Sequence, residues 1–332
     1  MNNKFLLNIS FFLSLLLLAS ACGEDEYSIP ELSQNLQNDA IKRSIGPNIV
    51  GSEIDFAYAM ALPASRGKII SAQVEASIPG ASGTFLENNA YHTDPQTGAD
   101  AGRKIGEPSI TTGAITKVDF SIDTFAVTLR YKYIIPEEAR GKSVNFTFSA
   151  LGSNGQEVSY SMGPYDISEM DMVHELDLVH GSRNFISIAD LAVYNIAQAV
   201  ANPEKVDLVY LYHFIPNQDA PFFHAIVAPT ADAEYRPGVV IPNGVNNNTK
   251  IKKAWKLQDR QLANLQYGIY IDDLDFQELD MTHSANYAIN LKNESGLWVE
   301  TADGKYRAYI YMNSTNMADQ SAVISIKRYQ MY

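Results

Sequence analysis

Acidic side chains cluster in one stretch of the last quarter of the chain, where they could do acid–base chemistry. Five carboxylates lie within nine residues: Asp272, Asp273, Asp275, Glu278 and Asp280. Two carboxylates about 5–5.5 Å or 6.5–9.5 Å apart are what a glycoside hydrolase needs. Acids also favour the first turn of a helix, because its amino end carries a partial positive charge. Asp273–Asp280 reads as a short helix, so the pattern favours a solvated acidic face over a catalytic pair.

The sequence lacks the common catalytic motifs. It has no G-x-S-x-G elbow, no H-E-x-x-H pair, no P-loop and no G-x-G-x-x-G. The six histidines show no metal-ligand spacing, although His213 and His224 fall on strands that could be neighbours. Asp94, Gly98 and Asp100 have the wrong spacing for an EF-hand. We therefore predict a non-catalytic protein without a metal site or a cofactor.

Sugar binding does not depend on a strict sequence motif as catalysis does, and one irregular stretch carries suitable residues. Aromatic rings stack on pyranose C–H groups, and amides hydrogen-bond to ring hydroxyls. The predicted ligand-binding patch consists of Trp255, Tyr235, Asn246, Asn247 and Asn248. The alternative is that Trp255 packs in a core while the asparagines build turns.

The amino end reads as a secretory signal peptide. Lys4 precedes an apolar stretch from Phe5 to Leu18, and the small residues Ala19-Ser20-Ala21 follow. About 7–15 apolar residues are too few to span a bilayer, so the pattern predicts cleavage after residue 21. The new amino end would be Cys22, the only cysteine of the chain.

This arrangement resembles a bacterial lipobox, although Ala19 stands where that pattern prefers Leu. The resemblance implies that the Cys22 thiol carries a diacylglycerol and anchors the protein in a membrane. Ordinary signal peptidase could also cut after Ala21 and leave a free thiol. Lipidation is favoured, because an exposed free thiol is reactive outside the cell.

The acidic run Glu24-Asp25-Glu26 follows the cysteine. It is similar to the export tag of Bacteroidetes lipoproteins that are displayed on the outer face of the outer membrane. The other interpretation is a solvated, flexible tether. We therefore expect an outer-membrane, lipid-anchored protein that faces the outside of the cell.

Composition narrows the possible partners. The formal net charge of −13 disfavours nucleic acid and anionic lipid, because both carry negative charge. A single cysteine excludes intramolecular disulfides. The length suits two domains of about 100–200 residues after removal of the signal peptide.

The first half has the period of two that is typical of strands. From Ile54 to Leu62 large side chains alternate with Ala57, Ala59 and Ala61, which predicts a strand packed on both faces. Ser153-Asn154-Gly155-Gln156 predicts a hairpin turn. Several such strands predict an immunoglobulin-like β-sandwich over residues 45–165, after a tether over residues 22–44. Residues 81–113 read as a long loop, and long loops are often functional.

Residues 166–332 mix strands with short helices. A helix is expected at Asn195–Asn202, with Asn195 as its N-cap. Thr249–Arg260 is cationic and reads as a possible helix, and Gln266–Ile271 reads as a strand. The chain ends in an antiparallel meander in which Trp298 is expected to be buried. The prediction is a mainly β protein whose second domain is α+β with an antiparallel sheet.

Several stretches together resemble an uncharacterised family of Bacteroidetes surface lipoproteins. The stretches are Ser143–Met162, Phe185–Tyr194, Lys205–Tyr212, Asn246–Trp255 and Ser295–Tyr329. The resemblance implies a place beside outer-membrane glycan importers of the starch-utilisation type, and it transfers no catalytic residue. Two roles remain besides polysaccharide binding or importer support. One is an extracellular glycoside hydrolase, and the other is an adhesin or structural surface subunit.

Overall fold

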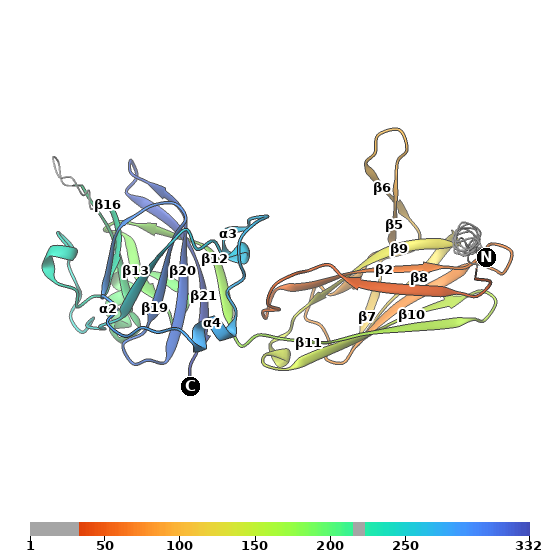
Figure 1. The fold of residues 1–332 in the computed structure, drawn as a ribbon, viewed down its shortest axis with the longest axis horizontal. Helices are drawn as coiled ribbons and strands as arrows, with labels where there is room; N and C mark the ends of the chain where they lie inside the picture. Colours follow the sequence, from red (N-terminus) through yellow and green to blue (C-terminus); the bar gives the residue numbers. More distant parts are fainter. Residues whose placement is uncertain (1–32, 215–222) are drawn as a thin grey trace, which may run out of the picture. The chain divides into compact units, whose positions relative to one another are not determined.

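The computed structural model describes residues 33–214 and 223–332 (Figure 1). Cys22 and the run Glu24-Asp25-Glu26 lie outside the described residues. Residues Asn35–Tyr332 form one compact unit that contains a two-sheet sandwich followed by a large curved sheet. About 51% of the described residues are in strands and 8% are in helices, so the predicted mainly β fold is confirmed. Within these ranges no helix has the length and apolar character needed to cross a bilayer.

The sandwich consists of two antiparallel sheets. The first has the order β1 (Gln37–Lys42), β2 (Glu53–Ala61), β9 (Ala126–Ile134) and β4 (Phe85–Leu86). The second has the order β11 (Glu157–Asp166), β10 (Ser143–Gly152), β3 (Ile69–Ala76), β8 (Ile115–Thr124) and β7 (Ile110–Thr112). The predicted hairpin joins β10 to β11, where the Gly152 amide donates to the Gln156 carbonyl at 2.8 Å.

Aromatic rings fill the space between these sheets. Phe56 lies 4.8 Å from Phe146 and 5.2 Å from Phe148, measured between ring centroids, and all three rings are buried. The other face of β2 is different, because Ala61 is exposed and Ala57 and Ala59 are half-buried. The prediction that β2 is packed on both faces is therefore wrong. Period-two alternation separates two faces without showing what covers each one.

The predicted loop over residues 81–113 is also wrong, because much of it forms strands. Besides β4 and β7, it contains the hairpin of β5 (Asn89–Thr93) and β6 (Asp100–Lys104), which projects from the sandwich in Figure 1. Its Gly, Thr and Asp residues are typical of loops, but backbone pairing within the hairpin overrides this weak local preference.

The second half is built around one sheet of ten antiparallel strands. Its order is β17 (Lys250–Trp255), β19 (Ser295–Glu300), β20 (Tyr306–Asn316), β21 (Ser321–Gln330), β12 (Asp171–Val179), β13 (Arg183–Ser187), β15 (Leu208–His213), β16 (Phe223–Val227) and β18 (Tyr287–Leu291), and β14 (Ala192–Asn195) pairs with β13. A bridge between Ile251 and Ala285 brings the two ends of the sheet together. The sheet is thus a nearly closed barrel, with an interior of aliphatic side chains such as Ile226, Leu297 and Ile310.

Helices in this half are short. They are α2 (Ile196–Ala201), α3 (Arg260–Ala263) and α4 (Asp273–Gln277), with 3-10 turns at Pro203–Lys205 and Ala233–Tyr235; the sandwich has a 3-10 turn at Glu137–Ala139. Asn195 caps α2 as predicted, since its side chain accepts the Gln198 amide at 3.0 Å. The possible helix at Thr249–Arg260 is wrong, because half of it is the strand β17. Gln266–Ile271 is not a strand and makes one isolated bridge, Asp259 to Ile269.

Residues 257–277 cover part of the outer face of the barrel. Leu262, Ile271 and Phe276 are buried there against the tyrosines of β20 and β21. Trp298 is half-buried in the same layer, with its ring 4.7 Å from that of Tyr309. Beneath this cover Lys327 and Asp259 form an ion pair of 2.6 Å, and both side chains are fully buried.

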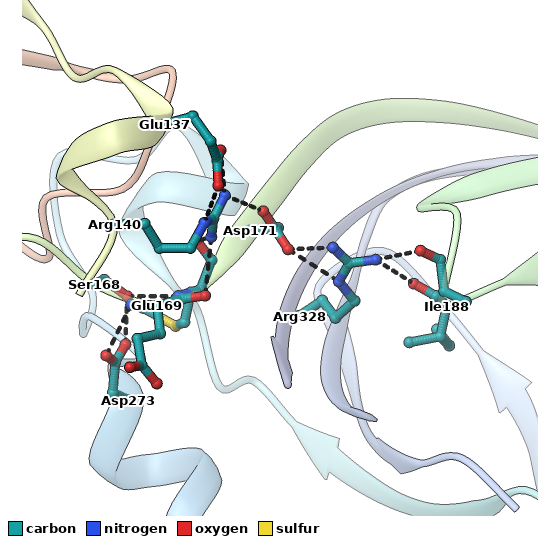
Figure 2. Close-up of polar contacts among 10 residues, drawn as sticks. Glu137, Arg140, Ser168, Glu169, Asp171, Ile188, Asp273 and Arg328 are labelled. Atoms are coloured by element: carbon teal, nitrogen blue, oxygen red, sulfur yellow. Dashed lines mark hydrogen bonds and ion pairs between the residues drawn. The ribbon is translucent and has the colours of Figure 1, made fainter. Parts of the chain in front are cut away.

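Polar side chains link the sandwich to the barrel (Figure 2). Arg140 donates to Glu137 in the sandwich and, at 2.8 Å, to Asp171 at the start of β12. The other oxygen of Asp171 pairs with Arg328, which also donates to the carbonyls of Ile188 and Ala189. One carboxylate therefore connects an arginine of the sandwich with an arginine of the barrel.

Candidate functional site

The structure does not bring the predicted sugar patch together. Trp255 is the last residue of β17 and is 51% exposed, with the Lys253 ammonium 5.8 Å from its ring centroid. Asn248 lies two residues before Lys250, the first residue of that strand. A strand rises about 3.3 Å per residue, which places Asn248 roughly 20 Å from Trp255. Trp255 cannot share a sugar ring with the asparagines.

The remaining patch residues mainly hold loops in place. The Asn247 amide donates to the carbonyls of Glu204 and Val206, each at 2.9 Å. The Asn248 oxygen accepts from Thr230 at 2.8 Å and from Asn286 at 3.0 Å. Asn246 is exposed. These contacts give Asn247 and Asn248 the turn-building role that was the alternative interpretation.

Only one face of the Tyr235 ring is open for stacking. Its ring lies parallel to that of Tyr287, with the centroids 3.6 Å apart and the planes inclined by 9°. One face of each ring is therefore covered by the other ring.

The acidic cluster serves helix α4. The Asp272 side chain caps the helix by accepting the amides of Leu274 and Asp275, and Asp275 accepts the Asp272 amide in return. Asp273 accepts from the Ser168 hydroxyl and the Glu169 amide (Figure 2). Carboxylates that satisfy backbone donors at a helix start have a structural role, as the dipole argument predicted.

The two histidines do not form a site. His224 pairs with Tyr212 across the ladder, so His213 and His224 point to opposite faces of the sheet. In residues 33–214 and 223–332 no group of three or more His, Cys, Asp or Glu side chains could hold a metal ion.

A groove on the sandwich is the strongest candidate that the sequence did not single out. It lies on the outer face of the sheet formed by β1, β2 and β9, and its volume is about 620 Å³. The strand register places Asp39, Ala59 and Thr128 in one row across the three strands, and Gln37, Ala61 and Ala126 in the next. Residues in one row point to the same face. On this face the central strand, β2, contributes only the methyl groups of its alanines, so the floor of the groove is low and apolar.

The projecting hairpin supplies a wall of this groove. Tyr91 of β5 lines it and is 39% exposed. The Arg130 guanidinium lies 5.5 Å from the ring centroid, a cation–π contact. Gly102 faces Tyr91 in the hairpin, and a Cβ at that position would lie 3.3 Å from the ring. The Tyr91 ring therefore lies beside the Gly102 backbone, which carries no side chain, and beside the Arg130 cation.

Polar groups border the apolar floor. Gln37, Asp39 and Thr128 are exposed and line the groove, so an amide, a carboxylate and a hydroxyl are available for hydrogen bonds. Among the described residues that line it, Asp39 is the only acid, and none is a lysine or arginine. The groove is thus close to neutral and offers no pair of carboxylates for hydrolysis.

Two signals in the sequence pointed toward this groove. The alternation of Ala57, Ala59 and Ala61 marked a face of β2 without large side chains, and Tyr91 lay in a long segment expected to be functional. The missing information was that the segment folds into a hairpin beside that face.

Comparisons with known proteins assign the chain to a family. Residues 33–167 match the model of a domain of unknown function, DUF4466, and residues 168–331 match a second domain of unknown function, DUF8576. A crystal structure of a DUF4466 family protein from Parabacteroides merdae is 46% identical to this chain. The two align over 90% of this chain and 100% of that one, with a TM-score of 0.85. The chain belongs to the DUF4466 family.

Other comparisons add little. No functionally curated protein matches the chain. The 35 kDa C-terminal fragment of the major pilin GBS80 of Streptococcus agalactiae is 11% identical, with a TM-score of 0.28 over 57% of this chain and 75% of that one. A likeness this weak supports no conclusion. The DUF4466 relative comes from a Bacteroidetes species, in keeping with the coarser part of the resemblance noted in the sequence.

Proposed function

We propose that this DUF4466 protein is a non-catalytic surface lipoprotein that binds polysaccharide in the groove of its sandwich. The observation that carries the proposal is the combination of an apolar floor, one fixed tyrosine ring and a polar border in a single open groove. A sugar chain has apolar C–H faces and hydroxyl edges, and such a groove offers a partner to each. Its volume of about 620 Å³ lies within the range of small-ligand sites.

The proposal favours binding over hydrolysis on chemical grounds. Hydrolysis of a glycosidic bond needs two carboxyl groups that flank the bond. The groove has Asp39 alone, and Asp272, Asp273 and Asp275 are bound to backbone amides or capping partners. An adhesin or structural subunit remains the competing role, and it differs from the favoured one in lacking a sugar ligand.

The proposed location rests on the sequence. A lipid on Cys22 would hold the amino end at the outer membrane, and Glu24-Asp25-Glu26 would direct the protein to the outer face. Two or three acyl chains, at about 0.8 kcal/mol per buried CH₂, make such an anchor hard to release. The resemblance to lipoproteins that accompany glycan importers makes an importer of the starch-utilisation type the proposed partner.

The proposal can be tested by removing the ring in the groove. Tyr91→Ala should weaken retention on a polysaccharide column by about 1–3 kcal/mol, the range known for stacking one base on an aromatic side chain. Tyr160→Ala is a matched control, because Tyr160 is 40% exposed, as against 39% for Tyr91, and belongs to β11 in the other sheet.

Each outcome separates the candidate roles. Equal losses in both variants would place the sugar site elsewhere. If the wild-type protein is folded and displayed but retains no polysaccharide from a broad panel, the adhesin or structural role replaces this one. Reproducible cleavage of a polysaccharide by the wild-type protein would favour the hydrolase.

A further inference from the structure

A second concave site lies at one end of the barrel, where β19 turns into β20 and the chain enters β15. This barrel-end pocket has a volume of about 380 Å³. Its lining includes Lys205, Asp207, Asn247, Asp303, Lys305 and Tyr306. Most of its lining residues are polar or charged, in contrast to the aliphatic interior of the barrel.

Asp207 is the unexplained group in this pocket. Its side chain is only 5% exposed, and one carboxyl oxygen accepts the Ile188 amide at 2.8 Å. No ion pair among the described residues includes Asp207. Burial raises the pKa of this carboxyl to about 7, although the backbone amides at Ile188 and Ala189 oppose the shift. A buried carboxyl without a counter-ion is unfavourable, and such groups are often found at binding sites.

A second acid adds to the negative charge. Asp303 lines the same pocket and accepts from the Thr301 hydroxyl at 2.6 Å and the Lys305 amide at 3.0 Å. Partial burial opposes ionisation of Asp303, but these hydrogen bonds and the positive charge of Lys305 outweigh it and lower its pKa. Asp303 is thus ionised at neutral pH, and its charge contributes to the raised pKa of Asp207.

The cations around the pocket already have partners. Lys205 pairs with Asp190 at 3.0 Å, and the Lys305 ammonium lies 5.1 Å from the Tyr306 ring centroid. Arg328 pairs with Asp171, and it donates to the carbonyls of Ile188 and Ala189 rather than to Asp207. The remaining charged group of the lining, Glu204, is a further acid and is exposed. The lining therefore carries three acids and two lysines, an excess of one negative charge when Asp207 is ionised.

We propose that the barrel-end pocket binds a small organic cation, whose primary ammonium supplies the counter-ion that Asp207 lacks. The pocket volume suits a molecule of up to about the size of one sugar ring. The Asn247 and Tyr306 side chains and the Thr301–Lys305 turn offer polar partners for hydroxyl groups on the same ligand. This site is separate from the groove, so the inference does not depend on the proposed function.

Binding of such a cation requires an ionised Asp207 and therefore depends on pH. With a pKa of about 7, roughly a tenth of Asp207 is ionised at pH 6 and roughly nine-tenths at pH 8. Apparent affinity falls in proportion to the competent fraction. A ligand that stays cationic over this range should thus bind about tenfold more tightly at pH 8 than at pH 6.

The test compares two probes of nearly equal shape, glucamine, which carries a primary ammonium, and sorbitol, which is neutral. We expect calorimetry or ligand-detected NMR at pH 8 to show glucamine binding at least tenfold more tightly than sorbitol. Asp207→Asn should abolish this preference and the pH dependence. Asp177→Asn, an exposed acid on β12, should leave both unchanged.

Several results would overturn the inference. These are equal affinity for the two probes, glucamine binding that survives Asp207→Asn in a folded variant, or no binding of glucamine at millimolar concentration. Asp303→Asn gives a second check that does not alter the buried group. It should weaken glucamine binding several-fold, and unchanged binding in that variant would also contradict the proposal.

Discussion

The buried ion pair between Lys327 and Asp259 gives the sharpest prediction of stability. The two charged atoms are 2.6 Å apart and neither side chain is exposed. At an effective dielectric constant of about 20 their attraction is about 6 kcal/mol, most of which offsets the cost of removing both charges from water. Lys327 also donates to the Ile271 carbonyl at 2.9 Å, which fastens the outer cover to β21.

Lys327→Met should lower the free energy of unfolding by about 3–5 kcal/mol, because it leaves the Asp259 carboxylate buried without a counter-ion. Three backbone amides, those of Gln261, Leu262 and Ile271, still donate to that carboxylate and keep the loss from being larger. Adding Asp259→Asn to the same protein should recover part of the loss, since the unpaired charge disappears.

Urea unfolding followed by circular dichroism measures these changes. If the unfolding free energy depends on urea concentration with the same slope in each variant, the variants unfold in the same way as the wild-type protein. Lys68→Met is the matched control, because Lys68 and Asp123 form an exposed pair of 2.6 Å with side chains 46% and 67% exposed. That variant should lose less than about 1 kcal/mol. If Lys327→Met costs no more than Lys68→Met, the reasoning from burial is refuted.

Between about pH 4 and 7 the contribution of Asp207 to stability should fall by roughly 4 kcal/mol as pH rises, because folded Asp207 keeps its proton while the unfolded chain releases it. The difference between wild type and Asp207→Asn in melting curves over this range should show that pH dependence. Trp255→Ala should cost less than about 1 kcal/mol and leave polysaccharide retention unchanged, since the ring is half exposed and is not among the residues that line the groove; lost retention would contradict the assignment of the groove. Cys22→Ser should release the protein from membranes, and mass spectrometry that finds an unmodified Cys22 thiol in the native protein would disprove the anchor.

Local patterns in the sequence predicted several elements correctly. The alternation in Ile54–Leu62 identified β2, Ser153–Gln156 identified a hairpin turn, and Asn195 identified the start of α2. Each of these features depends on residues that are neighbours in the chain. The cationic stretch Thr249–Arg260 was misjudged, because lysines of β17 that face outward do not follow a clear period of two.

The sequence by itself determined that the protein is mainly β, because the alternation of side chains along a strand and the residue types that favour turns are local properties. The sequence also predicted an exported amino end. Only the tertiary structure decided where function could lie. Tyr91 meets the methyl face of β2 through a hairpin that no local pattern announced, and Asp207 meets Asp303 across nearly a hundred residues of chain. Trp255 and Asn248, by contrast, are close in sequence but separated by the length of a strand, since Trp255 ends β17 and Asn248 lies two residues before its start. Which side chains share a pocket depends on strand pairing between distant segments, and that pairing is decided by burial of the whole core.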